Sequence, residues 1–158
     1  MSHEIRDMNK RQKAILVKFI TVIVITAVAV VAMINFKDWV NRSEAMRAME
    51  QLGQMVLQYQ KKYGSVPPES YVDRIKERLQ GNVRLGKLYY RALWIDFDSP
   101  PDTILAYTKK RYRSLFLDDG FIVLRLNGNV EWMGEREFEA LLAQHQSPME
   151  IQMLQQVE

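Results

Sequence analysis

The residues from Ala14 to Phe36 are apolar almost without interruption, and Lys18 is the only charged side chain among them. Fourteen of these side chains are Val, Ile, Leu or Phe, and each favours membrane insertion by roughly 0.3–0.6 kcal/mol. A helix of this length covers about 34 Å, which exceeds the ~30 Å hydrocarbon core of a bilayer. The pattern therefore predicts a transmembrane helix over residues 14–36.

A cleaved secretory signal is the alternative interpretation of the same residues. The small residues Ala27, Ala29 and Ala32 are typical of a signal peptidase site, and a basic leader precedes them. The apolar core of a signal peptide usually spans only about 7–15 residues, however, so the longer run here favours a retained anchor.

The helical pattern continues beyond the apolar run. Apolar side chains recur at spacings of three and four and form one stripe, namely Ala45, Met49, Leu52, Val56, Tyr59 and Tyr63. Gly64 and Pro67-Pro68 then end the helix. We expect one continuous rod from Ala14 to Tyr63, with the stem over residues 37–63. The stripe is interpreted as a helix-packing interface formed by Ala45, Met49, Leu52, Val56 and Tyr59. It is either the face on which the rest of the chain folds or a coiled-coil seam for another helix. Both uses are compatible at different heights of the rod.

Residues 64–146 predict a small α+β head. A short amphipathic helix is expected over 71–79, and the aromatic segment 88–97 fits either a strand or a buried helical turn. Strands are expected over 103–108, 114–117, 121–126 and 129–133, which gives a three-to-four-stranded antiparallel sheet. Asn127-Gly128 predicts a two-residue type I′ hairpin turn.

Two further helical segments are expected near the end of the sequence. The pattern of Phe138, Leu141 and Leu142 predicts a helix over 135–143. Ser147 to Glu150 resembles a capping box, so residues 147–158 are expected to form a tail with a short helix.

Basic residues flank the predicted span unequally. Arg6, Lys10, Arg11 and Lys13 precede it, whereas the basic residues that follow it are interleaved with Asp38 and Glu44. This bias predicts a cytoplasmic leader over residues 1–13, a single-pass protein of the inner membrane and a head outside the cytoplasm. The bilayer is thus the first expected partner, with interfacial anchors at Lys13, Lys18 and Trp39.

The composition limits the available chemistry. The sequence has no cysteine and only two histidines, His3 and His145, so thiolate sites, zinc sites and catalytic triads are not expected. Asp96, Asp98 and Asp102 are weak candidates for a calcium site, because calcium requires about six oxygen ligands and acidic turns are common without one. No nucleotide or hydrolase motif occurs. The basic run 109–113 suits nucleic acid or anionic lipid, but it is interpreted as a solvated loop before a strand. We therefore expect no enzyme activity and no cofactor.

Two passages resemble type IV pilins and type II secretion pseudopilins. The residues from Met46 to Pro68, where a helix ends in Tyr63 and is followed by Gly64 and prolines, resemble the junction of stem and head in pseudopilins. The passage LRLNGNVEW from Leu124 to Trp132, followed by a helical segment, resembles the closing hairpin and helix of prepilin-like proteins. The resemblance implies a span continuous with a long helix, a small sheet-bearing head and assembly through the helix.

The start of the span departs from the prepilin pattern. Residues 12–19 (QKAILVKF) contain neither the glycine nor the glutamate that prepilins carry there for processing and assembly. The resemblance therefore brings no peptidase site to this chain.

Two hypotheses for function follow. The first is a pseudopilin-like structural subunit that packs beside other helices, those of other subunits or of further copies of itself, in an envelope secretion or pilus-like complex. The second is an anchored binding module, in which the stem is a spacer and the exported head recruits a protein or a surface ligand.

Overall fold

The computed structural model describes residues 10–95, 99–114 and 116–150. The helix α1 (Lys10–Tyr63) is a single unbroken helix of 54 residues, which confirms the predicted continuity of the apolar run and the stem. The shorter helices α2 (Glu69–Arg78), α3 (Asn82–Leu85) and α4 (Glu135–His145) and a 3₁₀ turn (Ala92–Trp94) complete the helical part. Gly64 takes φ +68° and donates its N–H to the carbonyl of Gln60, so α1 ends as its sequence predicts.

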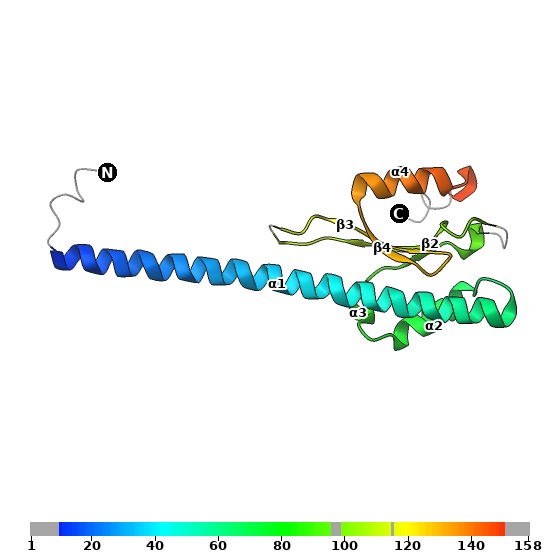
Figure 1. Ribbon diagram of the computed structural model, residues 1–158, viewed down its shortest axis with the longest axis horizontal. Coiled ribbons are helices and arrows are strands. Elements are labelled where there is room, and N and C mark those ends of the chain that lie inside the picture. The colour runs from blue at the N-terminus through cyan, green and yellow to red at the C-terminus, as the bar shows by residue number, and fades with distance from the viewer. Residues whose placement is uncertain (1–9, 96–98, 115, 151–158) are drawn as a thin grey trace.

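The strands form one antiparallel sheet in the order β1 (Tyr89–Tyr90), β2 (Ile104–Lys110), β3 (Gly120–Arg125) and β4 (Val130–Gly134). Figure 1 shows that one face of the sheet lies on the C-terminal half of α1, that α4 covers the other face, and that α2 and α3 lie on the far side of α1. The fold is therefore α+β, a long N-terminal helix followed by a small four-stranded sheet and short helices.

Two apolar cores lie on opposite faces of the sheet. The larger core joins α1 to the sheet and to α2 and α3, and includes Ala48, Met49, Leu52, Ile122 and Leu124. The smaller core lies under α4 and groups Ile104, Tyr107, Phe121, Val123, Met133 and Phe138. The ring of Phe121 stacks on that of Phe138 with centroids 3.8 Å apart. Because α1 forms one wall of the larger core, the stem belongs to the head and is not a separate spacer.

The predicted strand over 114–117 is wrong. The described residues between β2 and β3 form no strand, and β2 instead continues to Lys110. The physical reason is that polar groups of this segment bind α1: the backbone N–H of Arg113 and the hydroxyl of Ser114 pair with side chains of the long helix instead of with a neighbouring strand. We call residues 111–114 and 116–119 the β2–β3 loop.

The Asn127-Gly128 hairpin is present, but its turn differs from the predicted type I′. The N–H of Gly128 donates to the carbonyl of Arg125, and the N–H of Arg125 donates to that of Asn129. Gly128 has φ +84°, whereas no residue other than glycine has positive φ in the described part of the chain. The loop therefore holds three residues, 126–128, with the left-handed position at Gly128 alone.

Candidate functional site

The candidate site is the region of α1 where the apolar run ends and the head begins. One helix in the described residues, α1, is long and apolar enough to be a candidate membrane span, and none of its most apolar window is buried within the chain. Lys13 and Lys18 lie exposed on this helix, and their role as interfacial anchors stays a prediction.

The stem stripe faces the head of its own chain. Ala45, Met49, Leu52 and Val56 are buried in the larger core. Tyr59 is half-buried, and its ring lies 4.7 Å from that of Tyr71 on α2. The interpretation of this stripe as a seam for a second helix is therefore wrong for the four buried residues, because the sheet, α2 and α3 already occupy that face.

Trp39 lies just beyond the apolar run on the solvent side of α1. Its side chain is 58% exposed and stacks on the ring of Phe36, with centroids 6.3 Å apart. Phe36 is the last residue of the predicted span and is exposed as well. The pair forms an aromatic surface at the level expected for an interfacial anchor.

The β2–β3 loop is bound to α1 at the same level. The backbone N–H of Arg113 donates to Oδ2 of Asp38 over 2.9 Å, and the hydroxyl of Ser114 pairs with the side-chain oxygen of Asn35. Asp38 is buried as a result of this contact. Asn35 and Asp38 lie one turn apart on α1, so two successive positions of one helix face hold the loop.

An aromatic and cationic stack supports this attachment from the sheet side. The guanidinium of Arg42 lies 4.1 Å from the centre of the Trp132 ring on β4, and Tyr112 of the loop packs on the same ring at 5.7 Å. Burial raises the pKa of Tyr112 to about 12, although the charge of Arg42 acts in the opposite direction. The stack joins α1, β4 and the loop into one unit.

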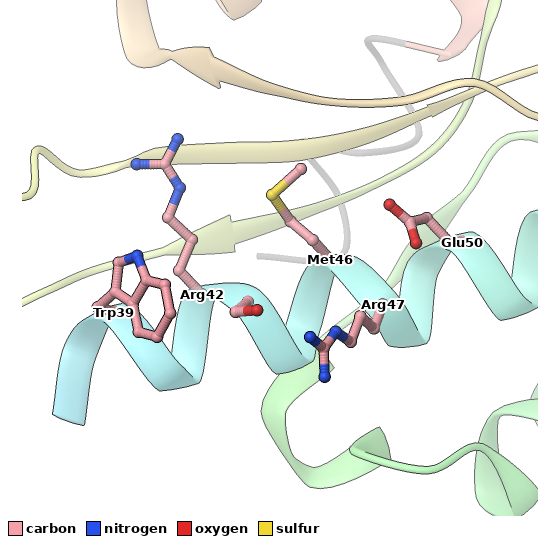
Figure 2. Close-up of a pocket in the computed structure, with 6 residues that line it drawn as sticks. Trp39, Arg42, Met46, Arg47 and Glu50 are labelled. Carbon is pink, nitrogen blue, oxygen red and sulfur yellow. The ribbon is translucent and has the colours of Figure 1, made fainter. Parts of the chain in front are cut away.

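A shallow groove of about 370 Å³ lies along the same stretch of α1. Figure 2 shows that Arg42 and Met46 point from α1 toward the strands, whereas Arg47 points away from them. The groove is lined by Trp39, Arg42, Ser43, Met46, Arg47 and Glu50, all from one helix. The lining therefore combines an aromatic ring and a thioether with two cationic side chains, a hydroxyl and a carboxylate on one stretch of α1.

The predicted calcium residues do not form a described site. Asp96 and Asp98 lie outside the described residues. Asp102 is exposed, and its backbone carbonyl accepts a hydrogen bond from Arg125 over 2.7 Å. No group of three or more metal-binding side chains occurs in the described parts of the chain.

Residues far apart in the sequence hold the head together, and none of them is among the predicted site residues. Arg91 and Glu150 form a buried ion pair, and Asn35 and Asp38 hold the β2–β3 loop. A signal existed for the second pair, because two polar residues spaced at three interrupt the end of an otherwise apolar face. No comparable signal marks Arg91.

Comparison with known proteins found no matching family, no matching curated protein and no matching solved structure.

Proposed function

We propose that this chain is a single-pass membrane protein with a non-enzymatic, pseudopilin-like structural role in an envelope assembly. In this proposal residues 14–36 cross the inner membrane, the N-terminus is cytoplasmic and the head lies outside the cytoplasm. The observation that carries the proposal is that one unbroken helix supplies both an exposed apolar run and a wall of the head's core.

Insertion of the apolar run is energetically favourable. Fourteen Val, Ile, Leu and Phe side chains at roughly 0.3–0.6 kcal/mol each contribute roughly 4–8 kcal/mol. Lys18 opposes insertion by about 2.5–3.5 kcal/mol on the same scale at the centre of a span, and by less here, because its place near the end of the run allows its amine to reach the headgroups. The balance favours a spanning helix.

The position of the head limits which surface of α1 other subunits can contact. The head covers the stripe from Ala45 to Val56, so the structural role requires other subunits to associate along the apolar span. A helix that continues without a break into a packed head transmits the orientation of that head rigidly to the span, which suits a repeating packed assembly.

The anchored binding module is the second candidate. The groove between Trp39 and Glu50 supports it, because an open surface with two arginines beside an aromatic ring suits a protein or anionic ligand. In this case contacts would concentrate at the groove and not along the span.

Single cysteines discriminate between the two candidates, since the natural sequence contains none. Each residue from Val22 to Phe36, and Glu50 in the groove, is replaced by Cys and labelled with a photoactivatable maleimide in native membranes. The structural role predicts adducts at span positions that repeat every three or four residues. Ala48→Cys, which faces the core, is the matched control and should give none.

The outcomes are distinct. Adducts at Glu50→Cys alone would support the binding module, and a membrane-inserted chain without adducts at any position would overturn the structural role. Release of the natural chain by alkaline carbonate would overturn the anchor itself. For topology, Val83→Cys on the exposed surface of α3 should react with an impermeant maleimide added outside the inner membrane, whereas Lys10→Cys should not.

A further inference from the structure

We propose that the β2–β3 loop is a second membrane contact, which places Phe116 and two arginines among the lipid headgroups at the point where α1 leaves the bilayer. The inference rests on the proposed membrane span and adds to it a contact made by the head. Its ligand is the surface of an anionic phospholipid bilayer.

The β2–β3 loop lies beside α1 at the level where the apolar run ends. Ser114 pairs with Asn35, and Arg113 donates to Asp38, so the loop is fixed beside the last turn of the run that ends at Phe36. Figure 1 shows the turn between β2 and β3 reaching along α1 toward its N-terminal half, beyond the rest of the head. A loop held at this level meets the interfacial region when residues 14–36 span the bilayer.

An exposed aromatic residue, Phe116, lies in the loop at this level. Phe116 is 80% exposed, and its backbone N–H donates to the hydroxyl of Ser114, which ties it to the residue that contacts α1. Phe36 and Trp39 are the other exposed aromatic residues on this part of the molecule. Three exposed rings at one level are costly in water but favourable at the headgroup boundary.

Cationic side chains also lie at this level of the molecule. Arg111, Arg113 and Lys37 are exposed at the same level, and cationic side chains are attracted to anionic headgroups. Two acids in the loop oppose them. Asp119 is bound to the loop itself, because its carboxylate accepts the N–H of Tyr112 over 2.8 Å, and Asp118 is exposed. Arginine beside an exposed aromatic ring is the combination that favours a charged lipid surface over a neutral one.

The attachment of the loop is rigid enough to keep this orientation. Tyr112 of the loop packs on the ring of Trp132, and the guanidinium of Arg42 on α1 lies over the same ring. The head therefore meets the membrane through the span and the loop together, which fixes its tilt as well as its distance from the bilayer.

Depth-dependent fluorescence quenching tests the inference on the full chain. Phe116→Cys is labelled with an environment-sensitive maleimide and the protein is reconstituted in vesicles of phosphatidylcholine and phosphatidylglycerol. We expect a blue-shifted emission and a loss of fluorescence with lipids that carry a nitroxide high on the acyl chain. Nitroxides near the chain end should quench it less.

Two control positions separate this inference from the proposed span. Leu93 is 82% exposed and lies beside Tyr59 and Pro67. Tyr59 is about 36 Å further along α1 than Asn35 by helix rise, so a label on Leu93→Cys should not be quenched. Ile23→Cys, inside the predicted span, should be quenched by the deep nitroxide. Quenching at Ile23→Cys with none at Phe116→Cys overturns the loop contact and leaves the span intact, whereas no quenching at Ile23→Cys overturns the span.

The same label tests whether the two arginines of the loop favour anionic lipid. In the native background we expect nitroxide-labelled phosphatidylglycerol to quench position 116 more strongly than nitroxide-labelled phosphatidylcholine. Arg111→Gln with Arg113→Gln should reduce this preference, by about fivefold per arginine. Arg74→Gln with Arg78→Gln on α2 is the matched control and should leave the preference unchanged. If the loop variant kept the same preference for phosphatidylglycerol as the native background, the arginines would not bind the anionic lipid.

Discussion

The guanidinium of Arg91 and the carboxylate of Glu150 form a two-pronged ion pair, with Nε to Oε1 at 2.6 Å and Nη2 to Oε2 at 2.8 Å. Both side chains are almost fully buried, at 3% and 1% exposure. Arg91 also donates to the backbone carbonyls of Ile104 on β2 and His145 at the end of α4. One arginine thus joins the segment after β1, the sheet and the residues that follow α4.

We expect Glu150→Ala to lower the free energy of unfolding of the head by about 3–5 kcal/mol, because it leaves the buried charge of Arg91 unpaired. Urea unfolding of the full chain in detergent, followed by tryptophan fluorescence, measures this change. Glu137→Ala on the exposed face of α4 is the control and should change it by less than about 0.5 kcal/mol. The double variant Arg91→Met with Glu150→Leu should recover most of the loss, and a Glu150→Ala chain as stable as the natural one would refute the role of the pair.

A pair of methionines on α1 tests the assignment of the stem to the core. Met49 is fully buried in the larger core, whereas Met55 is 37% exposed on the same helix. Met49→Ala should cost about 2–5 kcal/mol of unfolding free energy, since it leaves a cavity in the larger core. Met55→Ala should cost less than about 1 kcal/mol in the same urea titration. Equal effects of the two substitutions would contradict the observed packing of α1.

The contact of Asp38 with the β2–β3 loop predicts a local effect on proteolysis. Asp38→Ala removes a charged acceptor of the Arg113 N–H, which is worth about 1.5–3 kcal/mol, so trypsin cleavage after Arg111 and Arg113 should accelerate about tenfold or more. Mass spectrometry of the first fragments identifies the sites. Asp73→Ala on the exposed face of α2 should leave the rate unchanged. An unaltered rate in the Asp38 variant would mean that this contact does not hold the loop.

Lys110 predicts a dependence of stability on alkaline pH. Its ammonium group donates to the carbonyl of Leu85 over 2.8 Å, and burial, with a smaller effect of Lys76, lowers its pKa from 10.5 to about 8. Between pH 8 and 10.5 the unfolded chain retains this proton and the folded chain does not. The free energy of unfolding should therefore rise with pH across this window.

The size of this effect is limited because Lys110 is only about half buried. After allowance for solvent screening we expect a rise of about 1 kcal/mol relative to the variant Lys110→Met, which lacks the titrating group. Urea titrations of both chains at pH 7.5, 9 and 10.5 give the comparison. Parallel pH profiles of the two chains would exclude the lowered pKa.

Local patterns predicted most of the helices and strands, but not the short helix α3. The spacing of apolar residues predicted α1, α2 and α4, and Gly64 with Pro67 predicted where α1 ends. The capping prediction at Ser147 was met in part, since the N–H of Glu150 donates to the Ser147 hydroxyl over 3.2 Å and residues 148–150 are helical. The carboxylate of Glu150 turns to Arg91 instead of back to the cap, and the rest of the predicted tail helix lies outside the described residues.

The errors arose where a distant segment decided the local structure. The segment after Lys110 has strand-forming residues, but Arg113 and Ser114 find their partners on α1, and no short window of sequence contains both sides of that contact. The turn at Asn127-Gly128 also lies against a distant segment, because Gly128 is close to Leu57 and Gly53 of α1.

The sequence by itself determined that an apolar helix continues into an amphipathic stem and is followed by a small antiparallel sheet, because helix and strand periods are local properties of the chain. Only the tertiary structure decided that the stem's stripe belongs to its own head, that Asp38 holds Arg113 across 75 residues and that Glu150 neutralises Arg91 across 59. Contacts between such distant residues depend on how whole elements pack, and a single sequence carries no periodic signal for them.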